Sequence, residues 1–318
     1  MNNPSTALVL GCGAAVGAAW TVGALVSIRD ELGIDPTDAD LIIGTSAGAQ
    51  YGVMLSAGIG VDDLVALQRG HPTHPALTGH LSGEPAAVPR IPFGIPSHLR
   101  RVVRSDLPTL ARTSALLPDG TLTPHWLHRL AHLLAPRDWV DHRKLRLVAM
   151  DAATGQRVVF GAPDSPAATL AQALHASWAV PGMIRPATID GRQYLDGGTW
   201  STASADLAAG YDRVIVITPM ASLRHVARTG AGHIEHAVLR NPMTAGLCAE
   251  LATLHGSTQL AVFTPGTEDL AAMGPNFLDP RRRKAALDTA LRTTAVTARS
   301  IQRRWNAGRT DSGNERTG

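Results

Sequence analysis

The chain has few cysteines, few charged residues and no long apolar run. Its two cysteines, Cys12 and Cys248, are too few for a disulfide framework and lack metal-ligand spacing, which favours a reducing compartment. No uninterrupted apolar segment is long enough to cross a bilayer, and the first residues lack a basic leader. We therefore expect a cytoplasmic protein that contacts a membrane, if at all, only at the membrane surface.

The charge balance does not indicate a nucleic-acid partner. The sequence has 29 Lys and Arg residues against 26 Asp and Glu residues, and almost all of the positive residues are arginine. Arginine favours pairing with anions such as phosphates or anionic lipids, but an excess this small does not argue for nucleic acid. With 318 residues, of which 44% are hydrophobic, the chain can bury a large core.

The first fifty residues predict an α/β fold. Residues 7–10 predict a buried strand, residues 11–17 a glycine-rich loop, and residues 20–32 a helix that Gly33 ends. A second buried strand is expected at 41–43. This order implies a largely parallel central sheet that is covered on both faces. In such a sheet, the loops at the carboxyl ends of neighbouring strands open into one crevice.

A proline-rich stretch interrupts this pattern. Residues 70–124 contain many prolines and scattered histidines and arginines, so we expect few regular core elements there. The stretch forms either a lid over the site or a variable surface excursion. Thr123 and Pro124 then predict the N-cap and first residue of a helix through residue 134. The remaining expected elements are strands at 145–150, 157–160, 193–195, 214–217 and 260–263, and helices at 168–178 and 244–254.

The C-terminal part differs in charge from the rest. We divide the chain into a main domain at 1–265, a basic helical segment at 266–309 and a disordered tail at 310–318. The basic segment places apolar residues on one helical face and arginines on the other. It either docks on the main domain or lies on an anionic membrane surface.

The second strand leads into Gly44-Thr45-Ser46-Ala47-Gly48. A Gly-x-Ser-x-Gly sequence between a strand and a helix is typical of a nucleophile elbow, because small neighbours relieve its steric crowding. Backbone N–H groups near the start of the helix can meet a developing negative charge there. Ser46 is therefore a candidate nucleophile. The alternative is a small-residue turn without chemistry.

Asp196 is the candidate general base for Ser46. A short strand leads to Asp196, and Gly197 and Gly198 after it allow close backbone approach. A free Asp, with a pKa of about 3.9, is a weak base for a hydroxyl, so the site has to exclude water and raise this pKa. Two alternatives are a simple tight turn at Asp-Gly and a triad that uses a histidine. The histidines that follow Asp196 are His225, His233, His236 and His255.

The glycine-rich loop after the first strand is the candidate oxyanion hole. Its small residues can point several backbone N–H groups into the crevice, as an oxyanion hole requires. We expect these donors at Gly11, Cys12, Gly13 and Ala14, with Gly17 as support. The alternative is a dinucleotide-binding loop, but the glycine spacing misses that fingerprint by one residue. The second strand also ends without the acidic residue that contacts ribose.

A separate set of histidines has ligand-like spacing. His125, His128 and His132 share one face of the expected helix. Zinc would need convergent geometry and supporting partners, which the sequence does not indicate. We therefore expect no metal and no other cofactor.

Taken together, these motifs resemble the patatin-like phospholipase family. The resemblance rests on the glycine-rich loop, the Ser46 motif, Ala179-Val180-Pro181-Gly182 and Tyr194-Leu195-Asp196-Gly197-Gly198. It implies a three-layer α/β/α fold and a Ser-Asp dyad without a catalytic histidine. In this sequence, Ser46 matches the nucleophile, Asp196 the base and residues 11–17 the oxyanion loop.

The resemblance implies a lipid acyl hydrolase that cleaves carboxylic esters through an acyl-enzyme. The expected partner is a lipid or ester substrate, with contact at a membrane surface. The loop departs from the family pattern, because Cys12 and Ala14 stand where many members have glycine and Val16 where many have a basic residue. An alanine that needs a positive φ would be strained. The alternative function is a noncatalytic protein of the same fold that binds a lipid or acyl ligand.

Overall fold

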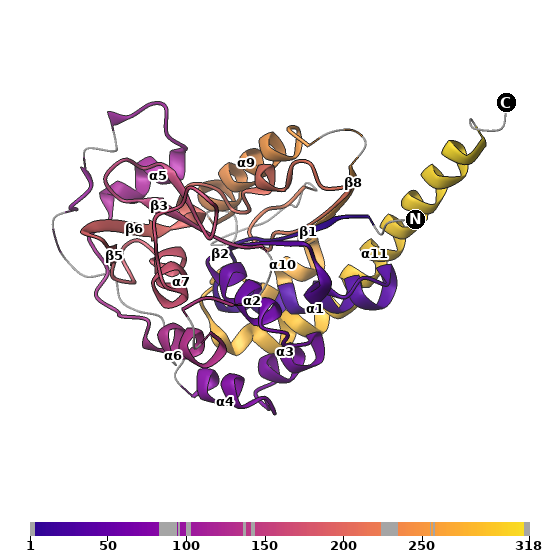
Figure 1. The fold of residues 1–318 in the computed structure, drawn as a ribbon, viewed down its shortest axis with the longest axis horizontal. Helices are drawn as coiled ribbons and strands as arrows, with labels where there is room; N and C mark the ends of the chain where they lie inside the picture. Colours follow the sequence, from indigo (N-terminus) through magenta and orange to yellow (C-terminus); the bar gives the residue numbers. More distant parts are fainter. Residues whose placement is uncertain are drawn as a thin grey trace.

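A computed structural model describes most of the chain. It covers residues 4–82, 94, 96–99, 103–135, 138–140, 144–223, 235–254, 256 and 258–314. Within these ranges, one mixed and mostly parallel sheet is flanked by helices on both faces, which confirms the expected fold class (Figure 1).

The sheet contains every strand that the sequence predicts and one more, β5. Each strand in the series β5-β6-β3-β2-β1-β7-β8 is hydrogen-bonded to the next, and β4 also pairs with β3. The pairs that involve β1, β2, β7 and β8 are parallel, whereas β4, β5 and β6 pair antiparallel. The strands are β1 (Thr6–Leu10), β2 (Leu41–Thr45), β3 (Leu145–Asp151), β4 (Arg157–Phe160), β5 (Ala187–Ile189), β6 (Arg192–Asp196), β7 (Arg213–Ile217) and β8 (Gln259–Phe263).

The helices form the two outer layers. The α-helices are α1 (Ala14–Leu32), α2 (Ala47–Ser56), α3 (Val61–Gln68), α4 (Pro75–Leu81), α5 (Thr109–Thr113), α6 (His125–Leu134), α7 (Leu170–Trp178), α9 (Asn241–Leu251), α10 (Thr267–Met273) and α11 (Arg283–Asn314). Figure 1 shows α9 on the opposite side of the sheet from α1, α2 and α3.

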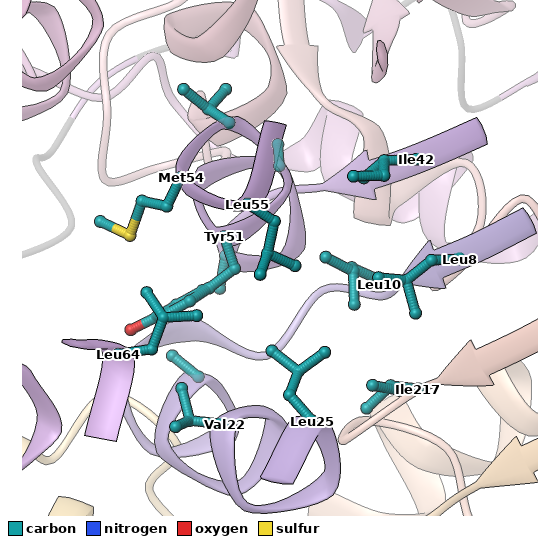
Figure 2. Packing of buried hydrophobic residues seen from close by; sticks show 14 of the residues in the cluster. Leu8, Leu10, Val22, Leu25, Ile42, Tyr51, Met54, Leu55, Leu64 and Ile217 are labelled. Atoms are coloured by element: carbon teal, nitrogen blue, oxygen red, sulfur yellow. The ribbon is translucent and has the colours of Figure 1, made fainter. Parts of the chain in front are cut away.

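Alternate residues of the strands supply two cores. Leu8, Leu10 and Ile42 pack with α1 and α2 on one face, as Figure 2 shows. Val9 and Ile43 belong to the core on the other face, to which α9 also contributes. Because successive strand residues point to opposite faces, a strand buried on both faces has to be apolar throughout. This explains the continuous apolar runs in the sequence.

Several expected boundaries differ from the structure, three of them in ways that matter here. Helix α1 begins at Ala14, so the second half of the predicted 11–17 loop is the first turn of this helix. The helix α6 begins at His125 with Pro124 as its N-cap residue, and Thr123 supplies no side-chain cap. The predicted tail is helical through Asn314, because α11 continues to that residue. Residues 315–318 lie outside the described residues.

The proline-rich stretch contains more of the core than expected. Helix α4 packs against α6, and its Leu77 and His80 are buried. Helix α5 places Ala111 in a small core with Met150 and Leu195. The expectation of few core elements at 70–124 is therefore wrong at these two helices. Residues 83–93, 95 and 100–102 of the stretch lie outside the described residues, so a role as a lid stays a prediction.

Helix α11 is packed tightly against α1. A Cβ at Gly23 of α1 would lie 2.5 Å from the Ala290 Cβ of α11. The hydroxyls of Ser27 and Thr294 lie 2.7 Å apart across the same contact. The long C-terminal helix is thus part of the helical layer beside the sheet. Within the described ranges, no helix is long and apolar enough to cross a membrane.

Candidate active site

Two strands that end on the same edge of β3 bring the candidate residues together. Strand β2 pairs with β3 up to Thr45, opposite Val148, and β6 pairs with β3 up to Asp196, opposite Ala149. Strand β4 pairs with these same β3 residues and therefore occupies the other edge. The ends of β2 and β6 consequently approach each other head to head. Ser46, the residue after β2, lies at this junction.

Ser46 occupies the sharp turn between β2 and α2. Its φ is +57° and its ψ is −122°. Residues other than glycine rarely adopt a positive φ, at a cost on the order of 1–3 kcal/mol. Gly44 and Gly48 are required beside it, since a Cβ at Gly48 would overlap the Leu10 carbonyl, and one at Gly44 would lie 2.5 Å from Ala49 Cα. The motif therefore forms a sharp turn, the elbow, that only small neighbours of Ser46 permit.

The Ser46 hydroxyl lies close enough to the Asp196 carboxyl group to lower its pKa. Asp196 also accepts a hydrogen bond of 2.7 Å from the Gly198 amide. Both Ser46 and Asp196 are 4% exposed. Burial raises the pKa of Asp196 to about 7, although the interactions with Ser46 and Gly198 lower it. A carboxyl group that titrates near neutral pH can accept a hydroxyl proton at that pH.

The two glycines after Asp196 let the chain turn beside its neighbours. A Cβ at Gly197 would overlap the Val148 carbonyl of β3, and one at Gly198 would lie 3.1 Å from the Cys12 Sγ. The Asp196 side chain caps the turn through the Gly198 amide. The tight turn considered above is thus present, and the same carboxyl group also contacts Ser46.

Hydrogen bonding divides the expected oxyanion donors into two pairs. The amides of Gly11 and Cys12 donate to the carbonyls of Ile217 and Thr202, both at 2.8 Å, so these two donors are already used. Within the part of the chain that the structure describes, the amides of Gly13 and Ala14 have no acceptor. Because these two amides stand at the start of α1, they are suited to bind an anion.

Ala14 and Cys12 carry side chains at positions where a glycine loop has none. Ala14 has a φ of +47°, so the alanine in this position is strained. Cys12 is buried, and its Sγ lies 3.3 Å from the Thr202 hydroxyl. Burial, with the nearby Asp196 charge as a smaller cause, raises the pKa of Cys12 to about 12. The thiol is therefore protonated at neutral pH and is no competing nucleophile.

The sequence analysis missed the residues that surround this pair. The Ser177 hydroxyl on α7 and the Ala179 carbonyl after it bond to the amides of Ser46 and Asp196. Arg240, which lies near Cys12 rather than the pair itself, is 1% exposed and donates a 2.7 Å hydrogen bond to the Pro219 carbonyl. The sequence gives only one indirect signal for Ser177 and Ala179, which is their place directly at the Ala179-Val180-Pro181-Gly182 motif.

Two histidines in the described part of the chain form a pair between α6 and α7. His128 and His175 hydrogen-bond to each other at 3.2 Å, and His175 contacts the Arg185 carbonyl. Among the described residues, no group of three metal-ligating side chains is present. Of the later candidates for a triad, His236 begins the π-helical turn at His236–Arg240. His225, His233 and His255 lie outside the described residues.

A family model described as patatin-like phospholipase matches residues 95–209. The expected resemblance to this family is confirmed. The matched stretch contains Asp196 with Gly197 and Gly198, whereas Ser46 lies outside it. The match supports a lipid acyl hydrolase activity in general terms.

Two solved structures are similar to this chain. VipD from Legionella pneumophila has a TM-score of 0.47 and 15% identity, and the alignment covers 94% of this chain and 67% of that one. The type III effector protein ExoU has a TM-score of 0.38 and 15% identity, with 94% of this chain and 53% of that chain covered. This chain thus spans about half the length of ExoU. No curated protein sequence matches the chain.

Proposed function

We propose that this protein is a serine hydrolase that cleaves carboxylic esters of lipids through a Ser46–Asp196 dyad. Three features support the proposal: the elbow conformation of Ser46, its contact with a buried carboxyl group, and two amides without an acceptor in the described residues. The contact between Ser46 and Asp196 is the observation that carries it, since a hydroxyl needs a proton acceptor to attack an ester.

In the proposed reaction, the Ser46 Oγ attacks the acyl carbonyl carbon as its proton passes to Asp196. The amides of Gly13 and Ala14 donate to the oxyanion, where one donor typically contributes about 3–4 kcal/mol to the transition state. Collapse of the tetrahedral intermediate expels the alcohol, which takes the proton from Asp196 and leaves an acyl-Ser46 ester. Water then attacks this ester, with Asp196 again accepting and returning one proton.

This proposal needs no histidine, because the raised pKa of Asp196 allows the carboxyl group to act as the base. An ordinary carboxyl group at pKa about 3.9 has too little affinity for a proton to deprotonate a hydroxyl efficiently. The burial that raises the pKa of Asp196 to about 7 brings the group into the range in which histidine normally works as a base.

The direct test is labelling with a fluorophosphonate probe, followed by mass spectrometry of the modified peptide. We expect label on Ser46 in the folded protein and hydrolysis of a short-chain ester. The Ser46→Ala variant should lose both. The Asp196→Asn variant should lose at least about 1,000-fold in kcat, because the proton acceptor is removed.

The histidine alternative and the noncatalytic alternative give different results in the same experiment. Retained turnover in Asp196→Asn, together with loss of turnover in His236→Ala, would indicate a histidine base. A protein that binds fatty acid tightly, shows no label at Ser46 and hydrolyses none of a broad panel of esters would be a noncatalytic acyl-ligand binder.

A further inference from the structure

We infer that the end of α7 sets the distance between Ser46 and Asp196, with Ser177 as a positioning residue for the nucleophile. The kinetic part of this inference rests on the proposed function. The structural part concerns the backbone of the elbow and stands on hydrogen bonds alone.

Ser177 connects the nucleophile to the central strand of the site. Its Oγ accepts a hydrogen bond of 3.0 Å from the Ser46 amide and donates one of 2.6 Å to the Val148 carbonyl. Its side chain is 0% exposed, so water cannot replace it without opening the site. Val148 is opposite Thr45 in the sheet. The hydroxyl therefore joins the end of β2 to β3 at the point where regular pairing between these strands stops.

The same helix end holds the base. The carbonyl of Ala179, two residues after Ser177, accepts a hydrogen bond of 3.0 Å from the Asp196 amide. The backbones of Ser46 and Asp196 are thus attached to groups that one short segment holds at a fixed spacing. A shift of this segment would change the contact between the Ser46 hydroxyl and the Asp196 carboxyl group.

The helix is well placed to act as a rigid support. A capping box between Thr169 and Gln172 fixes its start. Its residues pack against α6, β3, β6 and α2. The other end of α7 carries Ser177. The Ser46 amide precedes the first turn of α2 and has no helical carbonyl to which it can donate, so the Ser177 Oγ supplies the acceptor.

The test compares Ser177→Ala with Ser27→Ala. Ser27 is also buried, and its Oγ also contacts a carbonyl and a hydroxyl, but it lies in the contact between α1 and α11. We expect Ser177→Ala to lower kcat on a short-chain ester at least about tenfold with little change in KM, because the nucleophile loses its fixed position. Ser177→Cys, which keeps a weak acceptor, should fall between this variant and the wild type.

Two further measurements separate positioning from simple loss of stability. Because the contact with the Ser46 hydroxyl lowers the pKa of Asp196, its weakening should move the midpoint of the pH–kcat/KM profile upward in Ser177→Ala. Amide hydrogen exchange of the peptide covering β2 and the elbow should become faster in this variant. Ser27→Ala should change neither the midpoint nor this exchange, even where its thermal stability falls.

The outcomes distinguish this inference from the proposed function. An active wild type with an unchanged kcat, pH midpoint and elbow exchange in Ser177→Ala would overturn the inference and leave the proposed function intact. A wild type without label at Ser46 would overturn the proposed function. The exchange measurement would still decide whether Ser177 holds the elbow.

Discussion

The elbow at the end of β2 and the contact between α1 and α11 share two features: a glycine in close contact with a neighbour and a buried serine hydroxyl. Each contains a glycine whose Cβ would overlap a neighbour, Gly48 in the elbow and Gly23 in the helix pair. Each also contains a buried serine hydroxyl that bridges two elements, Ser177 and Ser27. The glycine and the serine therefore do not by themselves distinguish a candidate catalytic site from a structural contact.

The difference lies in what each glycine faces. Gly48 lies against the backbone carbonyl of Leu10 in the central strand β1, which cannot move without disturbing the sheet. A Cβ at Gly23 would meet the Ala290 Cβ first, at 2.5 Å, and this side-chain atom can be removed by a second substitution; the Ala290 and Leu291 backbone lies further away, at 3.1 Å. A fixed backbone partner makes the elbow intolerant of change, whereas a side-chain partner makes the helix contact adjustable.

Among the substitutions that test this comparison, the largest expected effect comes from Gly48→Ala. The new methyl group would force α2 away from β1 and displace Ser46, so the rate per folded molecule should fall at least about 100-fold. Turnover of a short-chain ester, normalised to folded protein by circular dichroism, measures this effect. The matched control is Gly52→Ala in the same helix, whose Cβ would lie 3.2 Å from the Ile42 side chain. If both variants kept wild-type activity, the tight approach of Gly48 to Leu10 would be unimportant.

The second effect concerns Asp196 and pH. Below pH 7 the protonated form of Asp196 dominates, so kcat/KM should fall about tenfold for each pH unit and level off above pH 7. A flat profile between pH 5 and pH 8 would contradict an essential base with this pKa.

The same group should affect stability in the opposite direction. The pKa of Asp196 is higher in the folded state than the value of about 3.9 expected when unfolded, so its contribution to stability is lost as pH rises from about 4 through 7. Asp196→Asn should therefore melt higher relative to the wild type at pH 8 than at pH 5. Thermal unfolding at the two pH values measures this difference.

The third effect is a loss of stability without a loss of catalysis. Gly23→Ala should lower the free energy of unfolding by about 1–3 kcal/mol, because it overpacks the contact between α1 and α11. Adding Ala290→Gly to the same chain should restore part of this loss, since it removes the atom that the new methyl group meets. Urea unfolding of the wild type, the two single variants and the double variant completes this double-mutant cycle and gives the interaction free energy between the two positions. A lower rate per folded molecule in Gly23→Ala would contradict the prediction that this contact affects stability and not catalysis.

The smallest expected effect is a gain in stability at Ala14. Glycine accepts the φ of +47° without strain, so Ala14→Gly should raise the free energy of unfolding by roughly 1 kcal/mol. Ala15→Gly, one residue further into α1, should instead lower it by up to about 1 kcal/mol, as glycine does inside helices. Equal changes in the two variants by urea unfolding would mean that the strain at Ala14 is negligible.

Local patterns predicted most of the secondary structure. The strands at 7–10, 41–43 and 214–217 were recognisable because both of their faces are buried and their residues are apolar throughout. Gly33 was recognisable as a helix end, since its φ of +65° favours glycine. The start of α1 was misjudged because consecutive small residues are compatible both with a loop and with a first helical turn.

The candidate site was only partly predictable. The Gly-x-Ser-x-Gly spacing indicated the elbow, because the crowding around Ser46 acts on neighbours within the same few residues. No local pattern could reveal that the amides of Gly11 and Cys12 donate to the carbonyls of Ile217 and Thr202, since both acceptors come from distant parts of the chain.

By itself, the sequence determined the elements and the small residues that allow the chain to bend sharply at Ser46 and after Asp196. These properties depend on backbone sterics and on the alternation of apolar side chains, which act over a few residues. Only the tertiary structure decided that β2 and β6 end on one edge of β3 and that Ser177 holds the elbow. It also decided the pKa of Asp196, because burial is a property of everything that packs around a carboxyl group and not of its neighbours in the chain.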